Sequence, residues 1–216
     1  MKFGVLGTGR VGKAIGAKLV ELGNDVTMGS RTADNAEASQ WAQSSGGDHG
    51  TFADAAAAGE IIVNATSGTA SLAVLASAGA SNLAGKVLID VANPLDGSAG
   101  FPPTLSVCNT DSLGEQIQRT YPDARVVKTL NTMNAGIMVA PKQLPGSHNV
   151  FVCGDDGTAK ATVAEILGSF GWPRDDIIDL GGIRAARGCE MVLTLWIELM
   201  RTIGSPQFNF HIARST

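Results

Sequence analysis

Residues 2–12, KFGVLGTGRVG, decide the fold of this chain. An apolar run at residues 2–6 leads directly into GTGRVG, and a stripe of apolar residues at helical spacing follows. A strand, a glycine-rich turn and a helix in this order are the context in which GxGxxG binds a dinucleotide. The stretch therefore predicts a βα unit whose turn holds the pyrophosphate of a nicotinamide coenzyme.

Each glycine of this turn has its own expected role. Gly7 allows the tight turn, Gly9 lets the backbone approach the pyrophosphate, and Gly12 lets the helix pack closely on the strand. The helix N-terminus offers free N–H groups and a positive dipole end, so we assign Arg10 and Val11 to the same site. A glycine-rich turn without a ligand is the alternative interpretation.

The residues after the second predicted strand indicate which coenzyme binds. An NAD enzyme usually carries an acidic residue about 20 residues after the glycines. Here the strand at residues 25–28 is followed by a glycine, Ser30 and Arg31. A hydroxyl and a guanidinium favour the 2′-phosphate of NADP(H), with Thr8 as a further donor. The alternative is a solvated turn, with Asp34 capping the next helix.

The alternation of strands and helices continues along the chain. Apolar runs rich in valine and isoleucine lie at residues 2–6, 25–28, 60–65, 86–91, 124–130 and 149–153. Consecutive apolar positions suit strands covered on both faces, and βα alternation implies a parallel sheet. The predicted fold class is α/β, a Rossmann-type doubly wound parallel sheet with a small C-terminal α/β annex.

A linker at residues 134–148 predicts two domains. We expect an NADP-binding Rossmann domain at residues 1–147 and a small C-terminal domain for acceptor binding and dimerisation at residues 148–216. About 70 residues are marginal alone, so the second domain should pack on the first or on another subunit. Its helix at about residues 184–203 is apolar over most of its surface, with its two glutamates, Glu190 and Glu198, expected at polar edges. This pattern predicts a homodimer contact, with a cap over the cofactor crevice as the alternative.

The composition excludes several other classes of protein. The 216 residues are 44% hydrophobic and 17% charged, which is typical of a globular protein. The 16 basic and 20 acidic residues give a net charge of −4, so neither nucleic acid nor an anionic membrane is an expected partner. No stretch approaches the ~18 apolar residues of a membrane span, and the N-terminus lacks a secretory apolar segment. We therefore expect a cytoplasmic protein.

Small and amide side chains follow three further predicted strands. Ligands of open α/β sheets bind outside the carboxyl ends of the strands, so these loops should converge on one crevice. The predicted contacts are Ala65, Thr66, Ser67, Ala92, Asn93, Pro94, Asn131 and Ala135. Small side chains leave room for two stacked rings, while the asparagines could fix polar edges. A simple turn at Asn93 and a loop cap at Asn131 are the alternatives.

No side chain is predicted to act as a catalytic acid or base. His49, His148 and His211 lie in separate segments and are expected in loops or at the surface. The three cysteines match no metal or redox spacing and are expected as buried thiols. Asp155 and Asp156 suit a turn and a helix cap, so no metal site is predicted.

With these motifs, the chain resembles the coenzyme F420-dependent NADP oxidoreductases, a family that includes the cytoplasmic reductase domains of the STEAP membrane proteins. The resemblance covers nearly the whole chain. It rests on GTGRVG (7–12), GSR (29–31), VKTLNTMNAG (127–136), VCGDD (152–156) and a long terminal helix ending in FNF (208–210). By resemblance, Thr8, Ser30 and Arg31 hold the 2′-phosphate, and loops 65–67 and 92–94 flank the ribose and nicotinamide. The backbone of Ala135 is implied to hold the carboxamide.

The resemblance implies an NADPH-dependent oxidoreductase. Its cofactor would be NADP(H), its second substrate F420 or a flavin, and its chemistry the transfer of hydride between two aligned rings. Two alternatives are a non-catalytic NADP(H) sensor and a small imine or ketone reductase, although the latter needs a proton donor and commonly a longer C-terminal domain. The chain departs from archaeal members at Asn35, where they carry a basic residue, and in loop 67–71, where they carry bulkier side chains.

Overall fold

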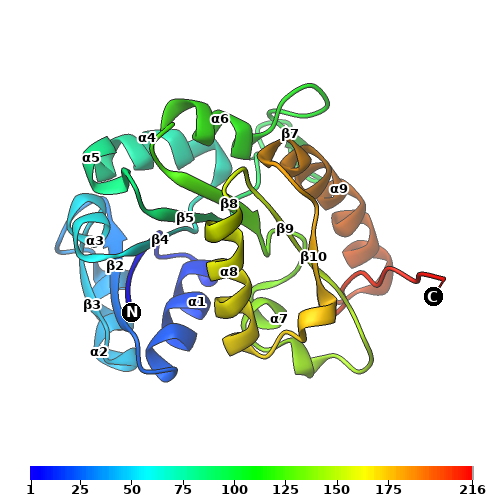
Figure 1. Ribbon diagram of the computed structural model, residues 1–216, viewed down its shortest axis with the longest axis horizontal. Helices are drawn as coiled ribbons and strands as arrows, with labels where there is room; N and C mark the ends of the chain where they lie inside the picture. The colour runs from blue at the N-terminus through cyan, green and yellow to red at the C-terminus, as the bar shows by residue number, and fades with distance from the viewer. Residues whose placement is uncertain (216) are drawn as a thin grey trace.

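The structure, a computed structural model, describes residues 1–215. Its main strands are β1 (Lys2–Leu6), β2 (Asp25–Ser30), β3 (Asp48–Thr51), β4 (Ile61–Asn64), β5 (Val87–Asp90), β8 (Arg125–Thr129), β9 (Val150–Cys153) and β10 (Ile177–Asp179). They form one eight-stranded sheet in the order β10-β9-β8-β5-β4-β1-β2-β3. Figure 1 shows this sheet through the middle of the molecule, with β2 and β3 toward one end and β9 and β10 toward the other.

The sheet is mostly parallel. Strands β3, β2, β1, β4, β5 and β8 run in one direction, whereas β9 pairs antiparallel with β8 through Lys128 and Cys153. This arrangement confirms the predicted Rossmann-type α/β fold. The sequence did not predict β3, because its residues Asp48–Thr51 include no branched apolar side chain.

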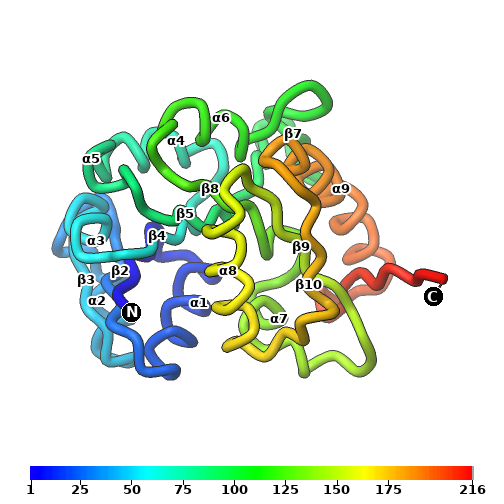
Figure 2. The backbone as a smooth tube through the Cα atoms, in the orientation of Figure 1, coloured from blue at the N-terminus to red at the C-terminus, as the bar shows by residue number. Residues whose placement is uncertain are grey.

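Helices cover both faces of the sheet, as the tube in Figure 2 traces. They are α1 (Arg10–Glu21), α2 (Ala36–Ser45), α3 (Phe52–Ala58), α4 (Gly68–Ala78), α5 (Ala80–Leu83), α6 (Leu113–Thr120), α7 (Ala135–Val139), α8 (Gly157–Phe170) and α9 (Ala186–Ile203). Shorter elements are β6 (Leu95–Asp96), β7 (Thr104–Leu105) and the 3₁₀ turns η1 (Pro141–Gln143), η2 (Arg174–Asp176) and η3 (Ile183–Ala185). One apolar core joins α1, α2, α7 and α8 to the sheet, and a second joins α3, α4, α6 and α9 to its other face.

The division into two domains stays a prediction. Strands from both sides of residue 148 share the sheet, because β9 and β10 extend it beyond β8. The last residue of the predicted second domain, Thr216, lies outside the described residues. Within residues 1–215, no helix combines the length and apolarity needed to cross a bilayer.

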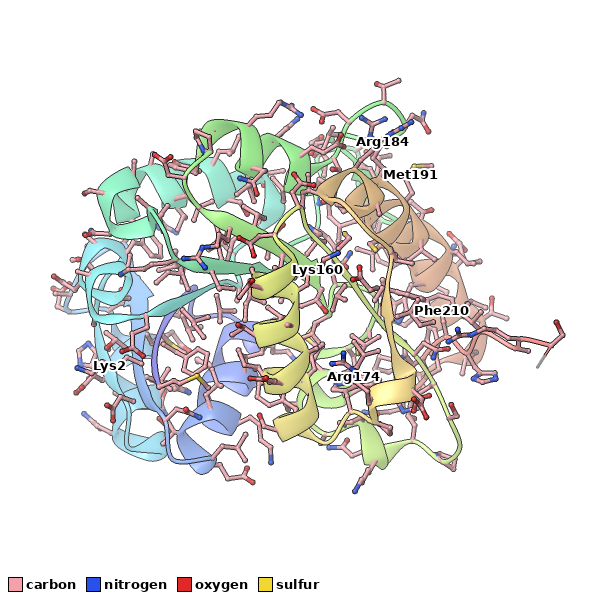
Figure 3. All side chains as sticks on the ribbon, viewed as in Figure 1. Lys2, Lys160, Arg174, Arg184, Met191 and Phe210 are labelled. Carbon is pink, nitrogen blue, oxygen red and sulfur yellow. The ribbon has the colours of Figure 1, made fainter. Side chains whose placement is uncertain are left out.

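Helix α9 has two contrasting sides. Toward the core it buries Cys189, Leu193 and Ile197, while Leu195 on the other side is 52% exposed. Met191, labelled in Figure 3, is also exposed on this helix. The helix stops at Ile203, so the FNF segment is part of a tail rather than the helix end.

The tail after α9 folds back onto the molecule. Phe208 stacks on Trp196 with ring centroids 5.3 Å apart. The side chain of Asn209 donates to Nδ1 of His148 at 2.9 Å, and Asn149 donates its backbone N–H to the carbonyl of Phe210. His148 lies in a loop, as expected, but it is buried under this tail, and its Nε2 lies 3.0 Å from the Pro141 carbonyl.

Other local expectations also need correction. The N-cap of α2 is Asn35, whose Oδ1 accepts from the N–H of Ala38 at 3.0 Å, and not Asp34. Cys108 is exposed, while the other two cysteines are buried as expected. Glu190 is fully buried rather than at a polar edge, because it finds cationic and N–H partners inside the protein.

Candidate functional site

The GTGRVG turn has the geometry that the sequence predicts. Gly7 adopts φ +117°, and a Cβ there would lie 2.6 Å from the Ala65 carbonyl oxygen. A Cβ on Gly12 would lie 2.0 Å from the carbonyl oxygen of Gly7, so α1 packs directly against the turn. No heavy atom lies within 4 Å of a Cβ built on Gly9. The backbone around Gly9 is therefore open to a ligand.

The first turn of α1 provides an anion-binding end. Gly9 is the N-cap and has no side chain, and the first helical bond runs from the N–H of Lys13 to the Gly9 carbonyl at 2.9 Å. The N–H groups of Arg10, Val11 and Gly12 consequently have no helical acceptor. No acidic residue lies in this turn, so nothing competes with an incoming phosphate.

A cavity of about 590 Å³ opens beside this turn. Predicted residues that line it are Gly7, Thr8, Gly9, Ser30, Arg31, Ala65, Thr66 and Ser67. Residues that the sequence did not predict there are Thr32, Asn35, Phe52, Ala70 and Val74. The cavity thus joins the carboxyl ends of β1, β2 and β4 and continues over α3 and α4, whose apolar side chains form one wall.

Arg31 is the charged side chain of the cavity wall. It is exposed and makes no ion pair among residues 1–215. Asn35 stands nearby on the same wall with its Oδ1 committed to the cap of α2, so its amide N–H₂ group faces no protein acceptor in the described chain. Both side chains can therefore donate to an anion at the end of β2.

Ser30 is less available than the sequence implied. Its side chain is buried, and its hydroxyl donates to the carbonyl of Thr32 at 2.6 Å. A hydroxyl carries one proton, so Ser30 would have to rotate before donating to a phosphate. Among residues 1–215 the Arg31 side chain makes no such hydrogen bond, so it is more available to an anion than Ser30 is.

An ion pair joins α1 to α2 near the cavity. Lys13 on α1 binds Glu37 in the first turn of α2. The hydrogen bond from Lys13 lowers the pKa of Glu37, which favours the carboxylate form of Glu37. The contact holds the N-terminus of α2, with Asn35, close to the start of α1.

Loop 65–67 lines the cavity, whereas the other predicted nicotinamide loops, 92–94 and 131–135, lie together outside its lining. Asn93 donates to the Asn131 carbonyl at 2.8 Å, and Asn131 donates back to Oδ1 of Asn93 at 2.9 Å. A Cβ on Gly68 would lie 2.1 Å from the Asn93 carbonyl oxygen, which brings loop 92–94 against the start of α4. The side chains of Ala92, Asn131 and Ala135 are buried, so backbone and small groups dominate this end.

The comparisons with known proteins agree with this geometry. Residues 2–94 match the family described as NADP oxidoreductase, coenzyme F420-dependent. A crystal structure from Arthrobacter sp. FB24, of a protein proposed to be an F420-dependent NADP reductase, is 54% identical with a TM-score of 0.94. The match covers 99% of this chain and 100% of that one. The chain belongs to the coenzyme F420-dependent NADP oxidoreductase family.

Two further proteins are similar to this chain at lower sequence identity. The rat metalloreductase STEAP3 is 29% identical over 194 residues, which are 88% of this chain and 36% of the rat protein. This chain therefore spans about a third of the length of that relative. A reductive aminase from Aspergillus terreus in complex with NADPH has a TM-score of 0.68 at 19% identity, over 93% of this chain and 62% of that one. This last likeness shows a shared fold.

The family membership confirms the resemblance seen in the sequence, and the members of this family are NADP-dependent oxidoreductases. Within residues 1–215, no cluster of three or more His, Cys, Asp or Glu side chains is placed to hold a metal ion. The cavity lining contains no histidine, carboxylate or tyrosine.

Proposed function

We propose that this protein transfers hydride between NADPH and a tricyclic acceptor, either the deazaflavin F420 or an ordinary flavin. The observation that carries the proposal is the single cavity that joins an open glycine turn to a free guanidinium. A dinucleotide phosphate needs the first feature and a 2′-phosphate needs the second.

The residues present fit NADP(H) along the length of the cavity. The turn at residues 7–12 would bind the pyrophosphate through its N–H groups. Arg31, helped by Asn35 and Thr8, would bind the 2′-phosphate. Phe52 and the apolar side chains of α4 would pack against the adenine ring.

The nicotinamide would extend toward loops 65–67, 92–94 and 131–135. When bound, NADPH supplies the hydride. The chain holds the ring between small side chains and fixed backbone, and it keeps water away because the loop residues beneath are buried. A tricyclic acceptor suits a lining without an acid or base, because the acceptor ring accommodates the hydride without a proton from the protein.

The proposal includes a homodimer in the cytoplasm. The outward side of α9 presents Met191, Leu195 and Ile203, which are 38%, 52% and 53% exposed. Burying these side chains against a second copy would remove apolar surface from water. A monomer in sedimentation at micromolar concentration would contradict this part of the proposal.

Anaerobic mixing with NADPH and a panel of acceptors tests the main proposal. The panel contains F420, FMN, FAD and riboflavin, together with a cyclic imine and a ketone, and the loss of reduced-nicotinamide absorbance is followed. Turnover with F420 or a flavin is expected. Turnover with the imine or ketone alone would make the protein a reductase of those compounds. Tight NADPH binding without any turnover would make it a sensor.

A further inference from the structure

A buried cluster of charges underlies the predicted nicotinamide loops. Lys128 of β8, Asp90 of β5 and Glu190 of α9 are 0%, 0% and 1% exposed. The Nζ of Lys128 donates to Oδ2 of Asp90 at 2.8 Å, to Oε1 of Glu190 at 2.8 Å and to the carbonyl of Ala92 at 2.6 Å. The three protons of the ammonium group are thereby all used.

This charge cluster, Lys128, Asp90 and Glu190, reaches two of the loops through hydrogen bonds. Oδ1 of Asp90 accepts from the side chain of Asn64 at 2.9 Å and from the N–H of Ala92 at 3.2 Å. Oδ1 of Asn64 in turn accepts from the hydroxyl of Thr66 at 2.7 Å, and Thr66 lines the cavity. Lys128 therefore holds one side of Ala92 while Asp90 holds the other.

The cluster also ties α9 to the sheet. Glu190 accepts the N–H groups of Leu113 and Gly114 at 2.8 and 3.0 Å, at the N-terminus of α6. This contact compensates the second buried carboxylate with the positive end of a helix dipole. Burial lowers the pKa of Lys128, but Asp90 and Glu190 outweigh it and raise the pKa overall, so the ammonium stays charged.

Stability alone is a weak reason for such a cluster. Apolar residues of similar volume often replace buried ion pairs without loss of stability, because desolvation cancels much of the attraction. What apolar residues cannot do is hold the carbonyl of Ala92 in one orientation. Ala92 precedes Asn93, whose side chain is fixed to Asn131, so the loop is clamped at two successive residues.

We propose that Lys128 is a positioning residue, which fixes loop 92–94 for the nicotinamide ring from beneath and does not touch the coenzyme. The inference rests on the proposed function, because it assumes that NADP(H) lies along the cavity with its nicotinamide at this loop. The adenosine half of the coenzyme would bind near Arg31 and Phe52, away from the clamp. Loss of the Lys128 hydrogen bond to Ala92 should therefore weaken binding of the nicotinamide half of the coenzyme and leave binding of the adenosine half unchanged.

The test compares two variants of the charge cluster, a control that keeps the ammonium and a variant that lacks it. Glu190→Gln removes one buried negative charge and keeps the ammonium on Ala92. Lys128→Met in the Glu190→Gln background removes the ammonium too, and Asp90, the one carboxylate left in the cluster, keeps its hydrogen bonds from Asn64 and Ala92. The affinities for NADPH and for 2′,5′-ADP, which lacks the nicotinamide, are measured by calorimetry on the full chain. The fluorescence of bound NADPH reports the environment of its reduced ring.

Wild type should bind both ligands, and Glu190→Gln should bind both within about twofold of wild type. The double variant should bind NADPH about tenfold more weakly than Glu190→Gln, as for one lost charge-assisted hydrogen bond that orders the loop. Its affinity for 2′,5′-ADP should change by less than about twofold, and the emission of bound NADPH should shift toward that of free NADPH. Equal losses for both ligands, or no loss for either, would overturn the positioning role.

Two further arms keep the test decisive. Failure of the wild-type protein to bind NADPH would refute the proposed function, and this result would be known before any variant is made. If the double variant does not fold, Lys128→Met in the Asp90→Asn background replaces it, since that variant also removes the ammonium from Ala92 while Glu190 keeps the N–H groups of Leu113 and Gly114. That variant should show the same selective loss of NADPH, and NADPH affinity equal to wild type would overturn the inference.

Discussion

Replacing Arg31 by alanine is the most direct test of how the coenzyme is chosen. The guanidinium lines the cavity at the end of β2 and has no ion-pair partner within residues 1–215. Its removal should therefore leave the fold intact, since it breaks no side-chain hydrogen bond or ion pair among those residues. The expected effect is a loss of NADPH affinity with little change for NADH.

The structure sets the size of this effect. A hydrogen bond to a charged group contributes roughly 1.5 to 3 kcal/mol, but water screens an exposed pair and reduces its contribution. Arg31 is exposed, and Asn35 and Thr8 remain as donors in the variant. We therefore expect a loss of about tenfold for NADPH, near 1.4 kcal/mol. The loss should shrink as salt is raised, because counter-ions screen the phosphate.

The assay is titration of NADPH and NADH into wild type, Arg31→Ala and a matched control. Arg174→Ala is the control, because Arg174 is also an exposed arginine but lies in η2 of the C-terminal half, as Figure 3 shows. It should bind both coenzymes as wild type does. Ser30→Ala should cost less NADPH affinity than Arg31→Ala, because the Ser30 hydroxyl already donates to the Thr32 carbonyl.

Equal losses of NADPH and NADH in Arg31→Ala would refute the reasoning. That result would mean that Arg31 supports the shape of the site rather than binding a phosphate. A wild-type protein that binds NADH more tightly than NADPH would also refute the reasoning, without any variant. In that case the open guanidinium would serve another anion.

Three other predictions concern the nicotinamide end, acid stability and thiol reactivity. Ala135→Trp should block hydride transfer while 2′,5′-ADP still binds, because Ala135 is buried at the nicotinamide loops; unchanged turnover would place the ring elsewhere. Arg187→Met should lower Tm most above about pH 5 and progressively less as the pH falls below about 4, since Arg187 lowers the pKa of Glu115 and that stabilisation is lost as the carboxylate protonates; a constant difference across pH would contradict this. Iodoacetamide should label exposed Cys108 in the native protein and spare Cys153, whose pKa is raised by its contact with the second buried thiol and by burial; mass spectrometry would show the reverse if this is wrong.

The sequence predicted the parallel part of the fold because local patterns encode it. Residues 2–6 form β1 with the expected bounds, and the GTGRVG turn has the tight, open geometry that its glycines imply. Strand β3 could not be read in the same way, since a polar edge strand at Asp48–Thr51 is defined by its pairing with β2. The direction of β9 likewise depends on a long-range pairing with β8.

The candidate site likewise contains residues that local motifs predict and residues that only tertiary packing brings there. The anion-binding turn and Arg31 follow from motifs, because each lies directly after its own strand. Phe52 and Val74 line the cavity because α3 and α4 pack beside it, and no spacing of residues in the sequence predicts this packing. The commitments of Ser30 and Asn131 to carbonyl oxygens were also hidden, since hydrogen-bond partners of buried polar groups are set by tertiary contacts.

One signal of this kind was nevertheless present in the sequence. Asp90, Lys128 and Glu190 each interrupt an apolar segment at a position where the strand or helix faces the core. Taken singly, each would be an error of patterning, because a lone buried charge is costly. Taken together, two acids and one base in three core-facing segments can compensate one another only if the segments meet. Opposite charges at core positions thus predict that β5, β8 and α9 are neighbours, and this contact brings the C-terminal helix to the loops proposed to hold the nicotinamide.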